Sequence, residues 1–141
     1  MSGFLLDTNV LSELVRPRPD ARVKAWIDAV DESLLYLSVL TLGEIRKGIA
    51  QLTDVRRRVA LETWLDSSLT LRFSGRILPI DAAVADRWGR LSAETAVRRP
   101  PLPVIDGLLA ATAMQHDMTL VTRNTKDLAR TPVPLFNPWT D

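Results

Sequence analysis

The sequence predicts a single α/β domain over residues 1–141, with a short, mostly parallel central sheet of four to five strands and helices on both faces. Short apolar runs alternate with longer amphipathic stretches, which is typical of parallel strands joined by crossover helices. A content of 46% hydrophobic and 25% charged residues matches an ordinary globular fold. A chain of this length can bury roughly 70% of its unfolded surface, so no second core is needed.

Two strands and their helices account for the first half of the chain. The expected elements, in order, are a strand at Phe4–Leu6, a helix over about 8–15, a helix from Asp20 to Ala29, a strand at Leu34–Ser38, and helices over about 41–52 and 54–71. Prolines at 17 and 19 end the first helix, and Asp20 caps the second. The last helix is expected to carry one apolar stripe, formed by Val55, Val59, Trp64, Leu65 and Leu69.

The second half continues the alternation. The expected elements, in order, are a strand over 76–80, a helix that Asp81 caps, a stiff connection over 98–103, a helix over about 105–115, a strand at 119–122, a turn-rich loop over 123–127 and a short strand at 134–136. Gly75 ends the helical region before these elements. Pro79 indicates an edge strand, because proline removes an N–H group from the strand ladder.

Composition excludes several kinds of chemistry. The chain has no cysteine, which excludes a disulfide, a thiolate nucleophile and a cysteine zinc site. His116 is the single histidine, so one chain cannot supply two imidazoles, and its place at a helix end favours a structural role. Apolar runs are far shorter than a bilayer requires and no signal-peptide pattern is present, so we expect a cytoplasmic protein without membrane association.

Arginine dominates the basic residues of a chain whose net charge is only +1. The arginines cluster at residues 16–18, 56–58 and 98–99. Arginine suits bidentate phosphate contact, although such clusters are also common on solvated faces that have no partner.

Three acids follow apolar, strand-like runs: Asp7, Glu44 and Asp106. Because the carboxyl ends of parallel strands open on one side of a sheet, these acids can converge. Several carboxylates in one pocket repel each other unless a hard cation lies between them, which indicates a metal site. Each acid also has a structural alternative: Asp7 and Asp106 can cap helices, and Thr41 with Glu44 matches a capping box.

Four segments in this order resemble the acidic-site motifs of PIN-domain nucleases: Leu6–Val10, Thr41–Gly48, Asp106–Thr112 and Thr122–Asn124. The chain is most similar to the VapC toxins of type II toxin–antitoxin modules, in the branch that ends with Phe-Asn-Pro-Trp, here residues 136–139. The resemblance covers essentially the whole chain and implies a PIN-like fold.

The resemblance also implies the site. Asp7, Glu44 and Asp106 would bind Mg²⁺ or Mn²⁺, and the catalytic set would be completed at position 124, where the family usually has an acid and this chain has Asn124. Asp127 has two interpretations: it replaces the negative charge that is missing at position 124, or it stabilises a turn. The supporting residues that the resemblance implies are Thr8, Asn9 and Thr122.

The implied function is a metal-dependent endoribonuclease that hydrolyses RNA phosphodiester bonds, forms a homodimer and is inhibited by a cognate VapB-type antitoxin. An alternative is a catalytically weak or silent PIN-like module that binds RNA or a protein partner, which Asn124 keeps open. A phosphotransfer enzyme or receiver domain fits poorly, because residues 7–9 lack the second acid of the phosphatase motif.

Overall fold

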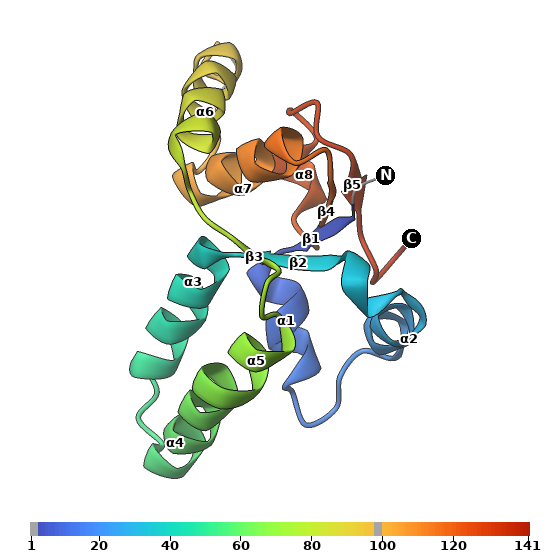
Figure 1. Ribbon diagram of the computed structural model, residues 1–141, viewed down its shortest axis with the longest axis vertical. Helices are drawn as coiled ribbons and strands as arrows, with labels where there is room; N and C mark the ends of the chain where they lie inside the picture. The colour runs from blue at the N-terminus through green and yellow to red at the C-terminus, as the bar shows by residue number, and fades with distance from the viewer. Residues whose placement is uncertain (1–2, 98–99) are drawn as a thin grey trace.

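Five parallel strands form one sheet at the centre of the molecule (Figure 1), in a computed structural model that describes residues 3–97 and 100–141. The strands of the described residues are β1 (Phe4–Leu6), β2 (Leu35–Ser38), β3 (Ile77–Leu78), β4 (Thr119–Val121) and β5 (Leu135–Phe136). Their order is β3-β2-β1-β4-β5, so β1 is central and β3 lies at an edge, as Pro79 indicates. The predicted α/β fold class with a parallel sheet is confirmed.

Helices cover both faces of the sheet, as predicted. Figure 1 shows α6, α7 and α8 on one side and α1 to α5 on the other. Their bounds are α1 Thr8–Leu14, α2 Ala21–Ala29, the 3-10 turn η1 Glu32–Leu34, α3 Val39–Ala50, α4 Val55–Thr63, the π-helical turn η2 Trp64–Leu69, α5 Thr70–Arg72, α6 Ala82–Thr95, α7 Val104–Gln115 and α8 Thr125–Leu128. Residues 98–99 of the expected stiff connection lie outside the described residues.

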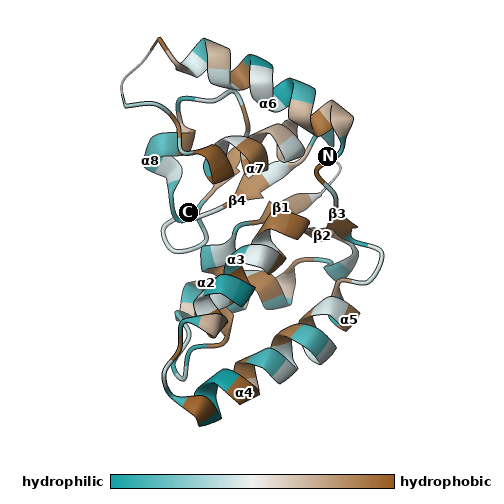
Figure 2. Cartoon of the chain, turned by 90° about the vertical axis from the view of Figure 1, so that its left-hand side faces the viewer, coloured by the Kyte–Doolittle hydropathy of each residue, from teal (hydrophilic) through white to brown (hydrophobic). Residues whose placement is uncertain are grey.

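Each face of the sheet has its own hydrophobic core. Along β1, Leu5 packs into the cluster beneath α6, α7 and α8, whereas Leu6 packs into the cluster beneath α1, α2 and α3. This alternation follows from the two-residue period of a strand. Figure 2 shows the strands among the most hydrophobic segments of the chain. Among the described residues, no helix has the length and apolar character that spanning a membrane requires.

In the helical arm, residues 55–72, the buried apolar residues differ from the predicted stripe. Val55 and Val59 are 59% and 53% exposed, whereas Leu65 and Leu69 are buried. Val55 and Val59 lie in α4, about two-thirds of a turn around the helix axis from Leu65, and the wider π-helical turn at Trp64–Leu69 changes the spacing of the buried positions after it. The prediction that these five apolar residues lie on or near one stripe is therefore wrong.

Two helices begin earlier than predicted. Ser38 at the end of β2 caps α3, since its Oγ accepts a hydrogen bond from the N–H of Leu40 at 3.0 Å. Thr41 and Glu44 therefore lie inside α3, and their prediction as a capping box is wrong. Helix α7 begins at Val104, so Asp106 belongs to its first turn and neither caps it nor follows a strand. The predicted loop over 123–127 likewise contains the start of α8.

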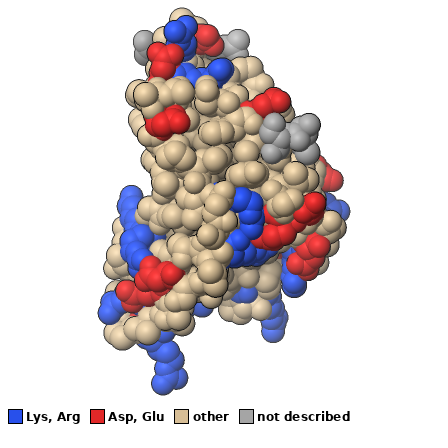
Figure 3. All heavy atoms as spheres, in the orientation of Figure 1, with Lys and Arg blue, Asp and Glu red and all other residues tan. Residues whose placement is uncertain are grey.

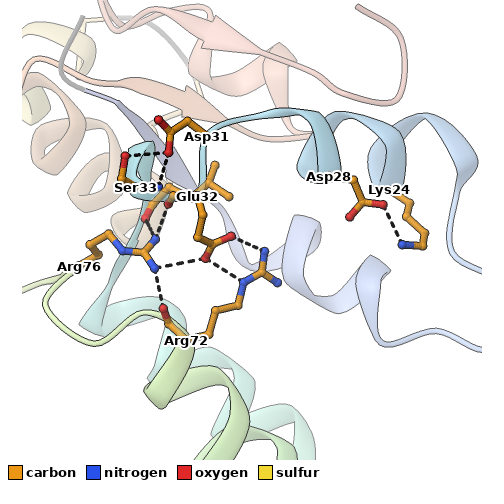
Figure 4. A network of polar contacts seen from close by, with 8 residues as sticks. Lys24, Asp28, Asp31, Glu32, Ser33, Arg72 and Arg76 are labelled. Carbon is orange, nitrogen blue, oxygen red and sulfur yellow. Dashed lines mark hydrogen bonds and ion pairs between the residues drawn. The ribbon is translucent and has the colours of Figure 1, made fainter.

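Arg76 fastens the edge of the sheet to η1 (Figure 4). Its guanidinium donates hydrogen bonds to the backbone oxygens of Glu32 and Leu35, each at 2.6 Å, and to the Glu32 carboxylate at 3.2 Å. Arg72 donates two hydrogen bonds to the same carboxylate, and with Arg76 it holds the pKa of Glu32 below its ordinary value. Both guanidiniums also lie over the ring of Phe73.

Arg76→Ala is expected to lower the free energy of unfolding by about 2–3 kcal/mol, because the carbonyls of Glu32 and Leu35 lose a charged donor. Urea denaturation followed by circular dichroism measures the change. Arg90→Ala is the matched control, since Arg90 pairs with exposed Asp86 one turn away, and such pairs contribute about 0.3–0.5 kcal/mol. Equal unfolding midpoints for the two variants would contradict this role of Arg76.

Candidate active site

A pocket of about 400 Å³ opens near the carboxyl ends of the central strands. Its lining residues are Asp7, Thr8, Asn9, Ser12, Glu13, Arg16, Glu44, Asp106, Arg123, Asn124 and Trp139. The structure thus brings the four predicted catalytic residues together with two of the three predicted supporting residues. The third, Thr122, is fully buried and hydrogen-bonds to Asp7.

Asp7 is fixed by its place after β1. Its N–H continues the strand ladder to the carbonyl of Val121 at 2.9 Å. One carboxylate oxygen accepts a hydrogen bond from the N–H of Thr8 at 2.7 Å, and the other accepts one from the Thr122 hydroxyl at 2.8 Å. Asp7 is therefore the N-cap of α1, as the structural alternative proposed, and an acid of the pocket at the same time.

Glu44 reaches the pocket from the second turn of α3. The Thr8 hydroxyl donates a hydrogen bond to Glu44 Oε1 at 2.6 Å, which joins the first turn of α1 to α3. Glu44 lies inside α3 and does not cap it. Helix capping therefore does not explain why an acid stands at this position.

Asp106 and Asn124 contact each other directly in the pocket. The Asn124 amide donates a hydrogen bond from Nδ2 to Asp106 Oδ2 at 2.9 Å. The Asn124 backbone N–H donates to the Thr122 hydroxyl, also at 2.9 Å. A carboxylate at position 124 would meet Asp106 as a second negative charge, whereas the amide satisfies it.

Asn9 connects the start of α1 to the segment after β4. Its Nδ2 lies 3.4 Å from both Asp7 Oδ2 and Thr122 Oγ1, and its Oδ1 accepts a hydrogen bond from the backbone N–H of Arg123 at 3.4 Å. Its contacts therefore hold the walls of the pocket together.

The acids of the pocket destabilise one another's charge. Burial raises the pKa of Asp7, and the negative charge of Glu44 adds to the shift. Burial, followed by repulsion from Asp7, Asp127 and Glu44, raises the pKa of Asp106 to about 6. Such mutual repulsion is what a bound cation relieves.

The donor set is chemically suited to a hard divalent cation, because carboxylate and amide oxygens are the ligands that Mg²⁺ and Mn²⁺ prefer. In the described part of the chain, however, no three acidic or histidine side chains stand close enough together to ligate one ion as they are placed. Neutral donors occupy an oxygen of each carboxylate instead. An ionised carboxylate offers about four lone-pair sites, so each retains capacity for a cation.

Asp127 and His116 lie outside the pocket lining. Asp127 belongs to α8 and reaches Asp106 only through its charge, so the structure does not place it as a substitute for the missing acid. His116 ends α7, the helix-end position that the sequence predicts, and its structural role stays a prediction.

The arginine clusters have different surroundings. Arg16 lines the pocket and forms an ion pair with Glu13 at 3.6 Å, while residues 56–58 lie on α4. Arg98 and Arg99 fall outside the described residues. On the face shown in Figure 3, acidic and basic side chains are interspersed rather than gathered into one basic surface.

Four lining residues were not predicted from the sequence: Ser12, Glu13, Arg123 and Trp139. Helical spacing could have found the first two, because they lie one turn after Thr8 and Asn9 on α1. Arg123 could have been found by its position next to Thr122. Nothing local to residue 139 indicates that its side chain returns to the pocket.

Comparison with known proteins gives one consistent family. The PIN domain family matches residues 4–134. The chain is 40% identical to Toxin FitB of Neisseria gonorrhoeae over 98% of this chain and 99% of that protein. It is 36% identical to VapC ribonuclease Y4jK of Sinorhizobium fredii over 96% and 97% of the two chains. The crystal structure of FitAcB from Neisseria gonorrhoeae superposes with a TM-score of 0.92 at 39% identity, covering 97% of this chain and 99% of that chain.

Asp106→Asn is expected to stabilise the metal-free protein at neutral pH. In the folded chain the pKa of Asp106 is about 6 rather than 3.8, so the folded state binds more protons between these values. Stability therefore falls as pH rises from 3.8 to about 6, and the amide variant escapes that loss. Allowing for solvent screening, the melting temperature in EDTA should rise by roughly 2 °C at neutral pH and be unchanged below 3.8.

Glu94→Gln is the control for this measurement, because it removes one exposed carboxylate from α6 without touching the pocket. A melting temperature that changes equally in both variants would mean that net charge, and not repulsion inside the pocket, is responsible.

Proposed function

This chain belongs to the PIN domain family, and from that premise we propose that it is a Mg²⁺- or Mn²⁺-dependent endoribonuclease acting as the toxin of a toxin–antitoxin pair. The observation that carries the proposal is the convergence of Asp7, Glu44, Asp106 and Asn124 on one pocket. Relatives named a toxin and a VapC ribonuclease support the biological role and the reaction. The proposed location is the cytoplasm, where cellular RNA is found.

Each side chain has a defined part in the proposed hydrolysis. Asp7, Glu44 and Asp106 would hold the cation, and the oxygen of the Asn124 amide would add an uncharged ligand. A bound cation would supply Lewis-acid chemistry, which lowers the pKa of water and neutralises negative charge on phosphoryl oxygens. Thr122 and Thr8 keep the carboxylates of Asp7 and Glu44 aimed into the pocket, so that they are positioned before RNA arrives.

We expect inhibition by a VapB-type antitoxin that occupies the neighbouring groove between α1, α3 and α4. This groove, of about 260 Å³, is lined by apolar residues that include Ile45, Ile49 and Trp64, and it shares Thr8 and Glu44 with the acidic pocket. An antitoxin segment lying there would bring a basic side chain to the acids. We also expect a homodimer, for which α2 and the exposed outer side of α4 are available surfaces.

Asp7→Asn tests the nuclease directly. It should lower the rate of RNA cleavage by more than about a hundredfold, because even residues that only support metal ligands contribute about 10- to 100-fold. Purified protein, freed of any partner, is incubated with total RNA and Mn²⁺ or Mg²⁺, and new 5′ ends are mapped. Asp86→Asn, on exposed α6, should cut normally. Retained cleavage by a folded Asp7→Asn variant would reject the proposal.

Asn124→Asp separates a weak nuclease from a silent binding module. Adding a fourth carboxylate should raise Mn²⁺ affinity by roughly tenfold, since affinity at such sites follows the charge of the ligand set. The same change should lower the melting temperature in EDTA, because the new charge faces Asp106. Calorimetric titration with Mn²⁺ and thermal melting measure the two effects.

Asn124→Ala is the counterpart variant, and it should lose affinity for Mn²⁺ because it removes the amide oxygen. If the natural chain, the acidic variant and this variant all fail to bind Mn²⁺ or Mg²⁺, the pocket is not a metal site and the silent module becomes the better description.

A further inference from the structure

Two arginines line the acidic pocket, and they differ in what holds them. Arg16 forms an ion pair with Glu13 at 3.6 Å. Arg123 follows Thr122 in the sequence, and among residues 3–97 and 100–141 no carboxylate lies within ion-pair distance of its guanidinium. A cation beside several ionised acids without pairing to any of them requires a physical cause.

Trp139 supplies that cause. The guanidinium carbon of Arg123 lies 5.1 Å from the centroid of the Trp139 ring, within the range of a cation–π interaction. Tryptophan offers the most favourable ring for this contact, and Trp139 is only 8% exposed, so the ring is fixed in place. The interaction holds the guanidinium against the ring.

A tight turn at the end of the chain fixes the ring. The Asn137 side chain accepts a hydrogen bond from the N–H of Trp139 at 2.9 Å, and the Asp141 side chain accepts one from the N–H of Asn137 at 2.9 Å. From α2, Arg22 donates to the carbonyl of Trp139 at 3.1 Å. The first two bonds close the turn on itself, and the bond from Arg22 attaches it to α2.

A stacked guanidinium still has N–H donors free along its edge. Arginine carries five donors in one plane, and this fork matches the spacing of two phosphate oxygens. Of the described acids that line the pocket, Asp7, Glu44 and Asp106 would hold the proposed cation, and Glu13 pairs with Arg16. The donors of Arg123 are therefore available to an anion that enters the pocket from solvent.

We propose that Arg123 binds the phosphate backbone of RNA at the edge of the acidic pocket and that Trp139 is the positioning residue that holds it there. This inference rests on the proposed function, because it takes RNA as the ligand. Contact with the backbone would fix where the strand crosses the acids without reading its sequence.

The test is RNA binding as a function of salt. A fluorescein-labelled single-stranded RNA is titrated with the full chain in Ca²⁺, and its length is checked on a denaturing gel to confirm that it is uncut. Arg123→Ala should weaken binding about tenfold and reduce the slope of log K against log salt by about 0.7, the value for one phosphate contact on a single strand. Arg90→Ala, on α6, is the matched control and should change neither quantity.

The positioning role is tested by a double-mutant cycle. Trp139→Leu should weaken binding in the natural chain but add little to Arg123→Ala, whereas Trp139→Phe, which keeps an aromatic face, should recover most of the loss. Arg123→Lys should bind less well than arginine, since it keeps the charge but loses the planar fork. Thermal melting identifies any Trp139 variant that does not fold. In that case the Arg123 variants alone still test whether Arg123 binds RNA.

The outcomes separate this inference from the proposed function. An Arg123→Ala variant with unchanged affinity and unchanged salt slope overturns the inference, even if the natural chain cleaves RNA. Additive effects of Arg123→Ala and Trp139→Leu overturn the positioning role. Arginine-dependent binding by a chain that cuts no RNA in Mn²⁺ or Mg²⁺ supports the inference and rejects the nuclease. A natural chain that binds no RNA overturns the inference as well.

Discussion

Repulsion among the carboxylates of Asp7, Glu44 and Asp106 is the constraint to which the rest of the site responds. Each carboxylate is held by an uncharged donor: the Thr122 hydroxyl on Asp7, the Thr8 hydroxyl on Glu44 and the Asn124 amide on Asp106. A charged donor in any of these places would form an ion pair with the carboxylate and neutralise its negative charge. Uncharged donors fix the geometry and leave the negative charge in place, while the two arginines at the edge are held by other partners.

The order of the strands explains how residues so far apart in sequence share one pocket. β1 lies at the centre of the sheet, between β2 and β4, so the segments that follow these three strands are neighbours. The hydrogen bond from Thr122 to Asp7 spans 115 positions of the chain and joins two adjacent strand ends. The hydrophobic core on each face of β1 therefore also positions the site, because any shift of this strand would move Asp7 relative to the groups that donate hydrogen bonds to it.

Local signals predicted the parts of this fold that depend on neighbouring residues. Asp20 and Asp81 cap their helices as expected, because a cap needs only the two or three N–H groups that follow it. The start of α3 could not be read in this way, since both Ser38 and Thr41 are competent caps and the end of β2 selects the first. Asp106 was expected in the pocket for the wrong local reason, as it lies in a helix and not at a strand end. The place of Trp139 depends wholly on tertiary contacts, which no local pattern encodes.

The π-helical turn at Trp64–Leu69 gives the arm one more residue than a continuous α-helix of the same height would hold. One residue corresponds to a rotation of about 100° around a helix axis. Deleting a single residue within this turn would therefore restore regular α-helical geometry and leave the buried face after it, including Leu69, directed at the sheet. Such a deletion is therefore expected to shorten the arm by one residue without displacing any strand.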